Sequence, residues 1–408
     1  MIARFHADPA VQSVEMLLQE RIPTQAPVEY PHQEEVIAHA APQSNVTLTP
    51  WSVPIEAAVP QVHVLSNGHY STLITSAGAG YSQWQGVGLT RWQADATRDD
   101  WGSWIYLQDQ DSGELWSAGY QPTGVTPDTP QVTFYPHQAE FQRRDHDIVL
   151  HMQITVAADD DVEIRQITLV NDSSSTRRLR LVSYAEVLLA PQAEPHPAFN
   201  KLFIESEYLA EQNLLLFHRR PRSADEKPIY LGHLCITDAG NAQPPTYDSD
   251  KRSFIGRGET AHGPAALDSR TSSLAGTSGF TLDPIIALGQ VLVLEARATV
   301  CVAYLTLATN SRQEALALTE RYKTWPTLTR AFESARRQNE LALRTLKLGT
   351  PQVALIQQVL AALLYPSAGL RASADILSAN SKGQNGLWAY SVSGDYPILL
   401  IRIADATA

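Results

Sequence analysis

The chain has 408 residues, of which 44% are hydrophobic and 18% charged, a composition typical of a globular protein with two or three domains. Its formal net charge of −12 argues against nucleic acid or an anionic membrane surface as the main partner. No stretch approaches the roughly eighteen apolar residues of a membrane-spanning helix, and the N-terminus lacks the apolar core of a signal peptide. We therefore expect no membrane segment in this chain. The two cysteines, Cys235 and Cys301, fit a reducing compartment, and we expect a cytoplasmic location.

Residues 1–60 are predicted to form an N-terminal helix and a linker arm. Asp8 can cap a helix that runs to Arg21, with Pro9 in its first turn and an apolar stripe that includes Leu17. The following residues, up to Pro60, are rich in Pro, Ala, Gln and Glu and show little periodicity, which is typical of a linker.

Residues 61–308 read as one strand after another. Val162–Val170 alternates apolar and polar residues, a polar turn follows, and Arg178–Val187 returns, so we predict a hairpin. About 250 residues of strands exceed a seven-stranded sandwich and predict two large stacked antiparallel sheets. We expect Thr237–Ser278 to form surface loops and Asp159–Asp161 to form a solvated turn.

Five of the eight tryptophans lie between Ser66 and Trp116, interleaved with glycines. Two interpretations fit these aromatic residues: they can line a sugar site, or they can fill the core of a sandwich. Arg98, Asp99 and Asp100 likewise form either a structural ion pair at a loop corner or a sugar contact.

The periodicity becomes helical after residue 308. Ser311 and Glu314 form a capping pattern for a helix to about Lys323, and a second helix follows Pro326 to about Leu348. A third helix begins at Pro351 and is apolar around most of its circumference, so we expect it to be buried among other helices. A last apolar helix is predicted to begin at Ile398.

Carboxylates are the remaining candidates for chemistry, because the twelve histidines lack ligand spacing and predict no metal site. Asp395 follows Ser393 and Gly394 just before an apolar helix, so it is either an N-cap or part of a binding loop. Gln384 and Trp388 lie close before it and favour the binding loop.

Several motifs resemble those of one family, glycoside hydrolase family 94, formerly called glycosyltransferase family 36. The motifs that carry the resemblance are Ser66–Tyr70, Ala79–Ser82, Leu89–Trp92, Arg98–Gly102, Ser183–Val187, His196–Phe199, Gly383–Trp388 and Ser393–Ile398. They are most similar to the phosphorylase-like part of cyclic β-1,2-glucan synthases and to β-1,2-oligoglucan phosphorylases. The similarity extends over essentially the whole chain.

The resemblance implies a mainly β fold. Residues 61–308 would form a galactose-mutarotase-like β-supersandwich that binds carbohydrate, residues 309–348 a helical linker, and residues 349–408 the start of an (α/α)6 catalytic barrel. A barrel of this kind has twelve helices, whereas about sixty residues hold two or three of ordinary length. The resemblance therefore implies a truncated barrel, whose general acid and phosphate-binding groups would lie beyond Ala408.

The implied parent activity is that of a glycosyltransferase or inverting glycoside phosphorylase acting on β-glucans, with inorganic phosphate as co-substrate and no cofactor. Asp395, Trp388 and Gln384 would bind substrate, no residue of this chain would be catalytic, and the chain alone would be inactive. The expected partner is a β-glucan or gluco-oligosaccharide, and a homodimer or an association with the missing barrel part is also expected. The alternatives are a non-catalytic glucan-binding module and a degenerate gene fragment.

Overall fold

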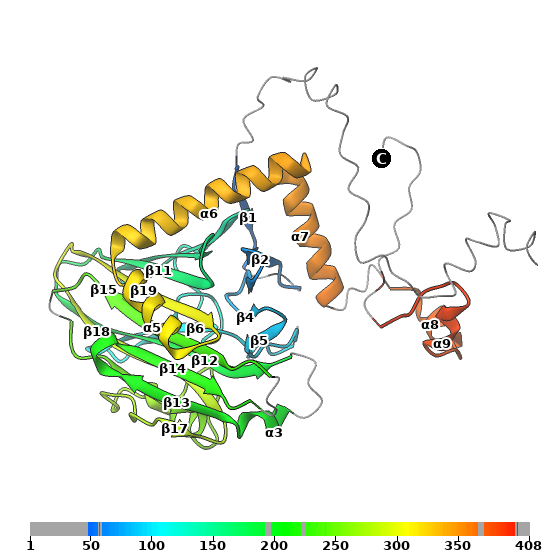
Figure 1. Cartoon of the computed structure of the whole chain (residues 1–408). Coiled ribbons are helices and arrows are strands. Elements are labelled where there is room, and N and C mark those ends of the chain that lie inside the picture. Colours follow the sequence, from blue (N-terminus) through cyan, green and yellow to red (C-terminus); the bar gives the residue numbers. More distant parts are fainter. Residues whose placement is uncertain are drawn as a thin grey trace, which may run out of the picture. The chain divides into compact units, whose positions relative to one another are not determined.

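The computed structural model describes residues 48–395, except residues 56, 58, 96, 192–196, 222–225, 241 and 366–370, together with residue 398. The helix predicted over Asp8–Arg21 and the helix predicted to begin at Ile398 lie outside the described residues. Two antiparallel sheets and a set of helices make up the described part (Figure 1).

The first sheet has ten strands, and each neighbouring pair in it is antiparallel. In spatial order these are β1 (Trp51–Val53), β8 (Gln131–Tyr135), β9 (Gln138–Asp145), β10 (Ile148–Val156), β11 (Val162–Asn171), β19 (Thr299–Thr309), β15 (Ile229–Thr237), β14 (Leu214–Arg219), β13 (Ile204–Leu209) and β17 (Gly279–Phe280).

The second sheet has nine strands and is organised around β12, a strand of 14 residues. Its main path runs β16 (Thr246–Asp250), β18 (Pro284–Leu294), β12 (Arg177–Ala190), β5 (Val87–Thr90), β4 (Gly80–Trp84), β3 (Tyr70–Thr75) and β2 (Val62–Ser66). One edge of β12 pairs with β18, and the other pairs first with β6 (Trp104–Asp109) and then with β5. The short β7 (Leu115–Ser117) pairs with β6.

The predicted hairpin between Val162–Val170 and Arg178–Val187 is wrong. β11 pairs with β10 and β19 in the first sheet, whereas β12 lies in the second sheet. The polar turn between them is a crossover, held by Asn171, whose side-chain amide donates to the carbonyl oxygens of Ser175 and Leu294. Alternation within a strand shows which face is buried, but it does not show which strand is the partner.

The main core fills the space between the two sheets. It shows which tryptophans between Ser66 and Trp116 are core residues. Trp84 and Trp116 are buried in this core. Trp104 is also buried, on the opposite face of the second sheet, where a cover of two short elements packs over it. For these three tryptophans the core interpretation is confirmed.

The cover over the second sheet corrects the expectation that residues 237–278 are surface loops. The cover consists of the short helix α4 (Lys251–Ile255) and the 3-10 turn η2 (Ala265–Leu267), whereas β16 of the same stretch is a strand of the second sheet itself. Phe254 and Leu267 are buried against Tyr106 and Tyr184 of the sheet. A few apolar residues in a polar stretch are enough to dock it, and composition alone gives them little weight.

Two helices cover the outer face of the first sheet. α5 (Arg312–Tyr322) begins where predicted, because the Ser311 hydroxyl oxygen accepts a hydrogen bond of 3.1 Å from the Glu314 N–H. The long α6 (Trp325–Leu346) follows and carries a proline in its first turn. Leu318 of α5 and Leu328 of α6 are buried together with residues of β11, β14 and β19.

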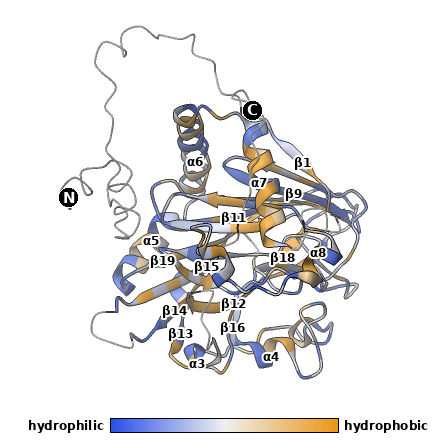
Figure 2. Ribbon diagram, turned by 90° about the vertical axis from the view of Figure 1, so that its right-hand side faces the viewer, coloured by the Kyte–Doolittle hydropathy of each residue, from blue (hydrophilic) through white to orange (hydrophobic). Residues whose placement is uncertain are grey.

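α7 (Thr350–Leu364), whose residues are mostly hydrophobic (Figure 2), packs against the second sheet at β2. Ala361 and Tyr365 are buried there, and the Gln357 side-chain oxygen accepts a hydrogen bond of 3.2 Å from the Val64 N–H. Leu355 and Ile356 remain 59% and 54% exposed. The predicted burial of this helix among other helices is therefore not met in the described part, where α7 contacts strands through one face.

The acidic run Asp159–Asp161 is not a merely solvated turn. The Asp161 carboxylate accepts a hydrogen bond of 2.6 Å from the Trp84 indole N–H. Asp160 accepts hydrogen bonds from Arg321, at 2.6 Å, and from the Tyr322 hydroxyl, at 2.9 Å. The run therefore joins strand β4 and helix α5 to the turn that precedes β11.

Within the described ranges, no helix combines the length and the apolarity needed to cross a bilayer. The same ranges hold no cluster of three or more His, Cys, Asp or Glu side chains that could hold a metal ion. The remaining short helices are α3 (Pro197–Lys201), α8 (Ala374–Ala379) and α9 (Asn385–Trp388).

Candidate carbohydrate site

The three residues predicted to bind substrate lie in one short segment around α9. Gln384 precedes the helix, Trp388 is its last residue, and Asp395 follows in the next loop. The Gln384 side-chain N–H donates to the Asp395 carboxylate at 2.6 Å and to the Ser393 carbonyl oxygen at 2.9 Å. The structure therefore brings Gln384 and Asp395 into direct contact.

Gly394 permits this contact. Its φ of +74° lies in the left-handed region, and a Cβ at this position would be 2.7 Å from Leu387 Cδ1 and 3.2 Å from Gln384 Cγ. A glycine is needed here for the Ser-Gly-Asp loop to close on α9. The alternative role of Asp395, as the cap of a helix from Ile398, concerns residues outside the described part.

Trp388 adds an aromatic surface to the same segment. Its side chain is 65% exposed and has no packing partner among the described aromatic pairs. An exposed indole face, a carboxylate and an amide are the groups that commonly bind sugars, one by stacking and the others by hydrogen bonding to hydroxyls. The arrangement can orient a sugar, and by itself it performs no bond cleavage.

A second polar group, between the two sheets, is structural. Glu163 of β11 accepts hydrogen bonds from Arg165 at 2.7 Å, from Tyr70 at 3.2 Å, and from Ser82. Next to it, the His233 ring contacts the hydroxyls of Ser183 and Thr306, each at 3.0 Å. Glu163, Arg165 and His233 line a cavity of only about 20 Å³, which is room for a single water molecule.

The buried His233 predicts a loss of stability in acid. Burial, reinforced by the positive charge of Arg165, lowers the pKa of His233 to about 3. In the unfolded chain the His233 ring becomes protonated near pH 6.5, whereas in the folded chain it stays neutral down to about pH 3. The contribution of neutral His233 to the free energy of unfolding is therefore complete above about pH 6.5, and it decreases by about 1.4 kcal/mol for each pH unit between about pH 6.5 and about pH 3. His63 and His137 are also buried, with pKa values lowered to about 3 and about 4, so they act in the same direction.

We expect His233→Gln to flatten the decline in unfolding free energy between pH 6.5 and pH 5, measured by urea denaturation. His69→Gln, at an exposed ring, is the control and should keep the wild-type slope. An unchanged slope in His233→Gln would contradict a neutral His233 in the folded state.

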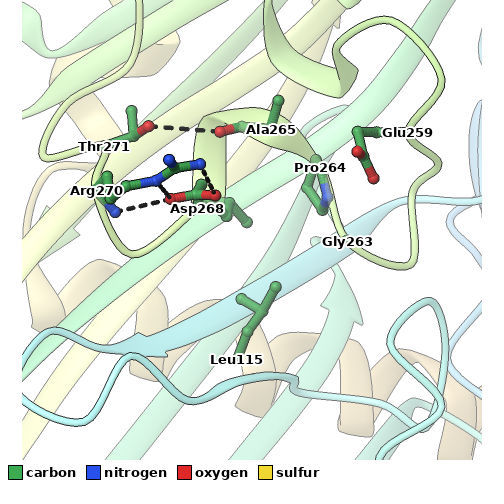
Figure 3. A pocket seen from close by; sticks show the side chains of 9 residues that line it. Leu115, Glu259, Gly263, Pro264, Ala265, Asp268, Arg270 and Thr271 are labelled. Carbon is green, nitrogen blue, oxygen red and sulfur yellow. Dashed lines mark hydrogen bonds and ion pairs between the residues drawn. The ribbon is translucent and has the colours of Figure 1, made fainter.

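A hollow of about 560 Å³ on the cover is a weaker candidate (Figure 3). Its cation, Arg270, is bound by Asp268 of the same loop at 2.9 and 3.0 Å and is otherwise exposed. Leu115 lies opposite them, and the described lining contains no aromatic side chain. The hollow lacks the stacking surface that a sugar site of its own would use.

The loop before β6 divides its acidic residues between two environments. Arg98 and Asp100 form the expected ion pair, at 3.0 Å. Asp99 is buried with φ +47°, and one of its carboxylate oxygens has no hydrogen-bond partner in the part of the chain that the structure describes. Burial, reinforced by the negative charges of Asp95 and Asp100, raises the pKa of Asp99 to about 7.

Two residues near this loop, Glu186 and Lys251, are not among the site residues predicted from the sequence. Glu186 lies 3.7 Å from Arg91 and also pairs with Lys251 of α4. Glu186 belongs to the motif Ser183–Val187, but nothing in the sequence distinguishes it from other strand residues. Lys251 lies in the stretch that was expected to be surface loops.

Comparison with known proteins identifies the family. Residues 53–325, more than half of the chain, match the family described as "Glycosyl hydrolase 94, supersandwich domain". The chain belongs to glycosyl hydrolase family 94. The predicted supersandwich is confirmed by this match and by the two antiparallel sheets. The barrel remains a prediction.

Similar proteins include a glucan synthase and phosphorylases. The chain is 33% identical, over 98% of its length, to the cyclic beta-(1,2)-glucan synthase NdvB of Rhizobium meliloti (strain 1021), and covers 14% of that protein. It is 27% identical, over 44% of its length, to the solabiose phosphorylase of Paenibacillus borealis, and covers 24% of that protein. The chain thus spans a quarter or less of these two relatives.

Among solved structures, the chain is similar to a bacterial glucoamylase in complex with acarbose. The match covers 78% of this chain and 43% of that one, at 7% identity and a TM-score of 0.43.

Proposed function

We propose that this family 94 chain is the sugar-binding N-terminal part of a protein that acts on β-glucans, and that Asp395 and Gln384 hold hydroxyls of a glucosyl unit beside Trp388. The observation that carries the proposal is the 2.6 Å hydrogen bond between Gln384 and Asp395. It fixes the carboxylate while leaving its other lone pairs for ligand hydroxyls. The name of the synthase relative suggests β-1,2-linked glucose as the substrate.

The proposal assigns binding, and no turnover, to this chain. Inverting cleavage requires a carboxylic acid that protonates the leaving oxygen, and phosphorolysis also requires groups that hold phosphate. Asp395 is exposed and accepts a hydrogen bond from an amide, an arrangement that suits a carboxylate contact better than a proton donor. Inorganic phosphate as co-substrate, a cytoplasmic location and a homodimer are further parts of the proposal.

Calorimetric titration of the purified chain with β-1,2-linked gluco-oligosaccharides tests the binding role. We expect Asp395→Ala to weaken association at the C-terminal loop by at least about tenfold, because a charge-assisted hydrogen bond contributes about 1.5–3 kcal/mol. Asp375→Ala, at an exposed carboxylate of α8, is the matched control and should bind as the wild type does.

Incubation of the same chain with glucan and phosphate tests the absence of turnover. We expect no glucose 1-phosphate. Its steady formation by the purified chain would contradict that part of the proposal, and unchanged affinity in Asp395→Ala would contradict the binding role.

A further inference from the structure

A cleft of about 180 Å³ lies on the outer face of the second sheet, between the loop before β6 and the cover. Its polar lining comes from separate segments of the chain. These side chains are Arg98, Asp100 and Trp101 of the loop, Glu186 of β12, Lys251 of α4, and Glu259. None of them belongs to the C-terminal segment around Asp395.

Four of the charged side chains at this cleft, Arg98, Asp100, Glu186 and Lys251, already take part in ion pairs. Arg98 bonds Asp100 at 3.0 Å, and Glu186 is bound by Lys251 and lies 3.7 Å from Arg91. Each carboxylate still has lone pairs for hydroxyl groups. The three carboxylates Asp100, Glu186 and Glu259 would repel a phosphate, so the cleft suits a neutral ligand with many hydroxyls.

Trp101 supplies the apolar part of the cleft. The Arg91 guanidinium carbon lies 4.3 Å from the centroid of its ring, and Lys251 Nζ lies 5.7 Å from the same centroid. These cation–π contacts hold the indole in place. Tyr184 and Ile255 complete an aromatic and apolar wall beside the charged groups, a combination typical of small-molecule sites.

The wall that the cover provides is fixed in advance by hydrogen bonds from the sheet. The Tyr106 hydroxyl donates to the Ala261 carbonyl oxygen at 2.6 Å, and the Gln108 amide donates to that of Leu267 at 2.7 Å. The buried Arg180 guanidinium donates to the Ala266 carbonyl oxygen at 3.2 Å. A preformed wall lowers the entropic cost of binding, because little has to become ordered when the ligand arrives.

Glu259 connects this cleft to the larger hollow on the cover. It lines both the 180 Å³ cleft and the 560 Å³ hollow that also contains Asp268 and Thr271 (Figure 3). The hollow lacks an aromatic surface of its own, but beside the cleft it can take the next unit of a chain.

We propose that the Trp101 cleft, together with the adjoining hollow, is a saccharide-binding surface of the supersandwich that takes a neutral gluco-oligosaccharide and works independently of the loop at Asp395. The choice of glucan as ligand rests on the proposed function. The location rests on the pairing of the charges, the fixed indole and the preformed wall.

Nuclear magnetic resonance of the full chain with ¹⁵N-labelled tryptophan tests the two sites separately. The chain has eight tryptophans, and Trp101→Phe and Trp388→Phe assign the two indole signals of interest. On titration with a β-1,2-linked glucose trisaccharide we expect the Trp101 signal to shift and saturate, and glucose alone to bind at least about tenfold more weakly. The Trp101 shift should persist in Asp395→Ala.

Glu186→Gln and Lys251→Met should each weaken the Trp101 response by at least about tenfold, whereas Glu314→Gln on α5 should leave it unchanged. A Trp101 signal that stays still while Trp388 shifts would overturn this inference and leave the proposed function intact. A Trp101 shift with a silent Trp388 would support it and count against the Asp395 site. A Trp101 response to inorganic phosphate that exceeds the response to the trisaccharide would also overturn it.

Discussion

Glu163→Ala should destabilise the fold by about 3–5 kcal/mol, because it leaves the Arg165 guanidinium buried without its carboxylate. Glu163 is 2% exposed and Arg165 is 8% exposed. Burial alone would raise the pKa of Glu163, but the positive charge of Arg165 and the hydrogen bonds from Ser82 and Arg165 outweigh it and lower that pKa. The carboxylate is therefore ionised at neutral pH, and equilibrium denaturation in urea measures the loss.

Two further variants distinguish the effect of an unpaired buried charge on stability from the effect of a smaller side chain. Glu163→Leu combined with Arg165→Met removes both charges and should recover a large part of the stability. Asp268→Ala removes the partner of Arg270 at an exposed pair and should cost far less stability than Glu163→Ala, because water solvates the charge that is left. If the double variant were as unstable as Glu163→Ala, the ionic explanation would be wrong.

Gly80→Ala should destabilise the fold by at least about 4 kcal/mol. Gly80 begins β4 with φ +145°, and an added Cβ would lie 1.9 Å from the Leu73 carbonyl oxygen of the neighbouring strand β3. Relief of that clash requires movement of backbone, which would disturb the ladder between β3 and β4.

Gly68→Ala provides the matched control for Gly80→Ala. Gly68 lies in the turn between β2 and β3 with φ +97°, but nothing lies within 4 Å of a Cβ added there. Its cost should therefore be limited to backbone strain, about 1–2 kcal/mol. Similar losses in the two variants, measured as denaturation midpoints with equal slopes, would contradict the role of the Leu73 contact.

The sequence predicts those features of the fold that depend on neighbouring residues. The start of α5 at Ser311 follows from one hydroxyl and the N–H three residues later, and both are visible in the sequence. The strand pattern likewise follows from alternation within each strand. Sheet membership does not, because one partner of each strand, β19 for β11 and β18 for β12, comes much later in the chain.

The candidate sites show the same division. Gln384 and Asp395 are 11 residues apart, so the sequence alone could assign them to one binding loop. The Trp101 cleft could not be predicted from the sequence. It needs Glu186 from β12 and Lys251 from the cover, and these residues come close to the loop only after the second sheet has formed. The prediction of a solvated turn at Asp159–Asp161 was wrong for a similar reason. Arg321, the partner of Asp160, lies on α5, 161 residues later in the chain.

The place of β19 in the first sheet has a consequence for how the protein folds. This strand is the last one along the described part of the chain, yet it lies in the interior of the sheet, between β11 and β15. During synthesis the exposed edges of β11 and β15 must wait for residues 299–309 before they can pair. Such non-local closure slows folding and leaves unpaired edges open to other chains in the meantime. The supersandwich therefore depends on its final strand to complete its first sheet and to remove its own aggregation-prone edges.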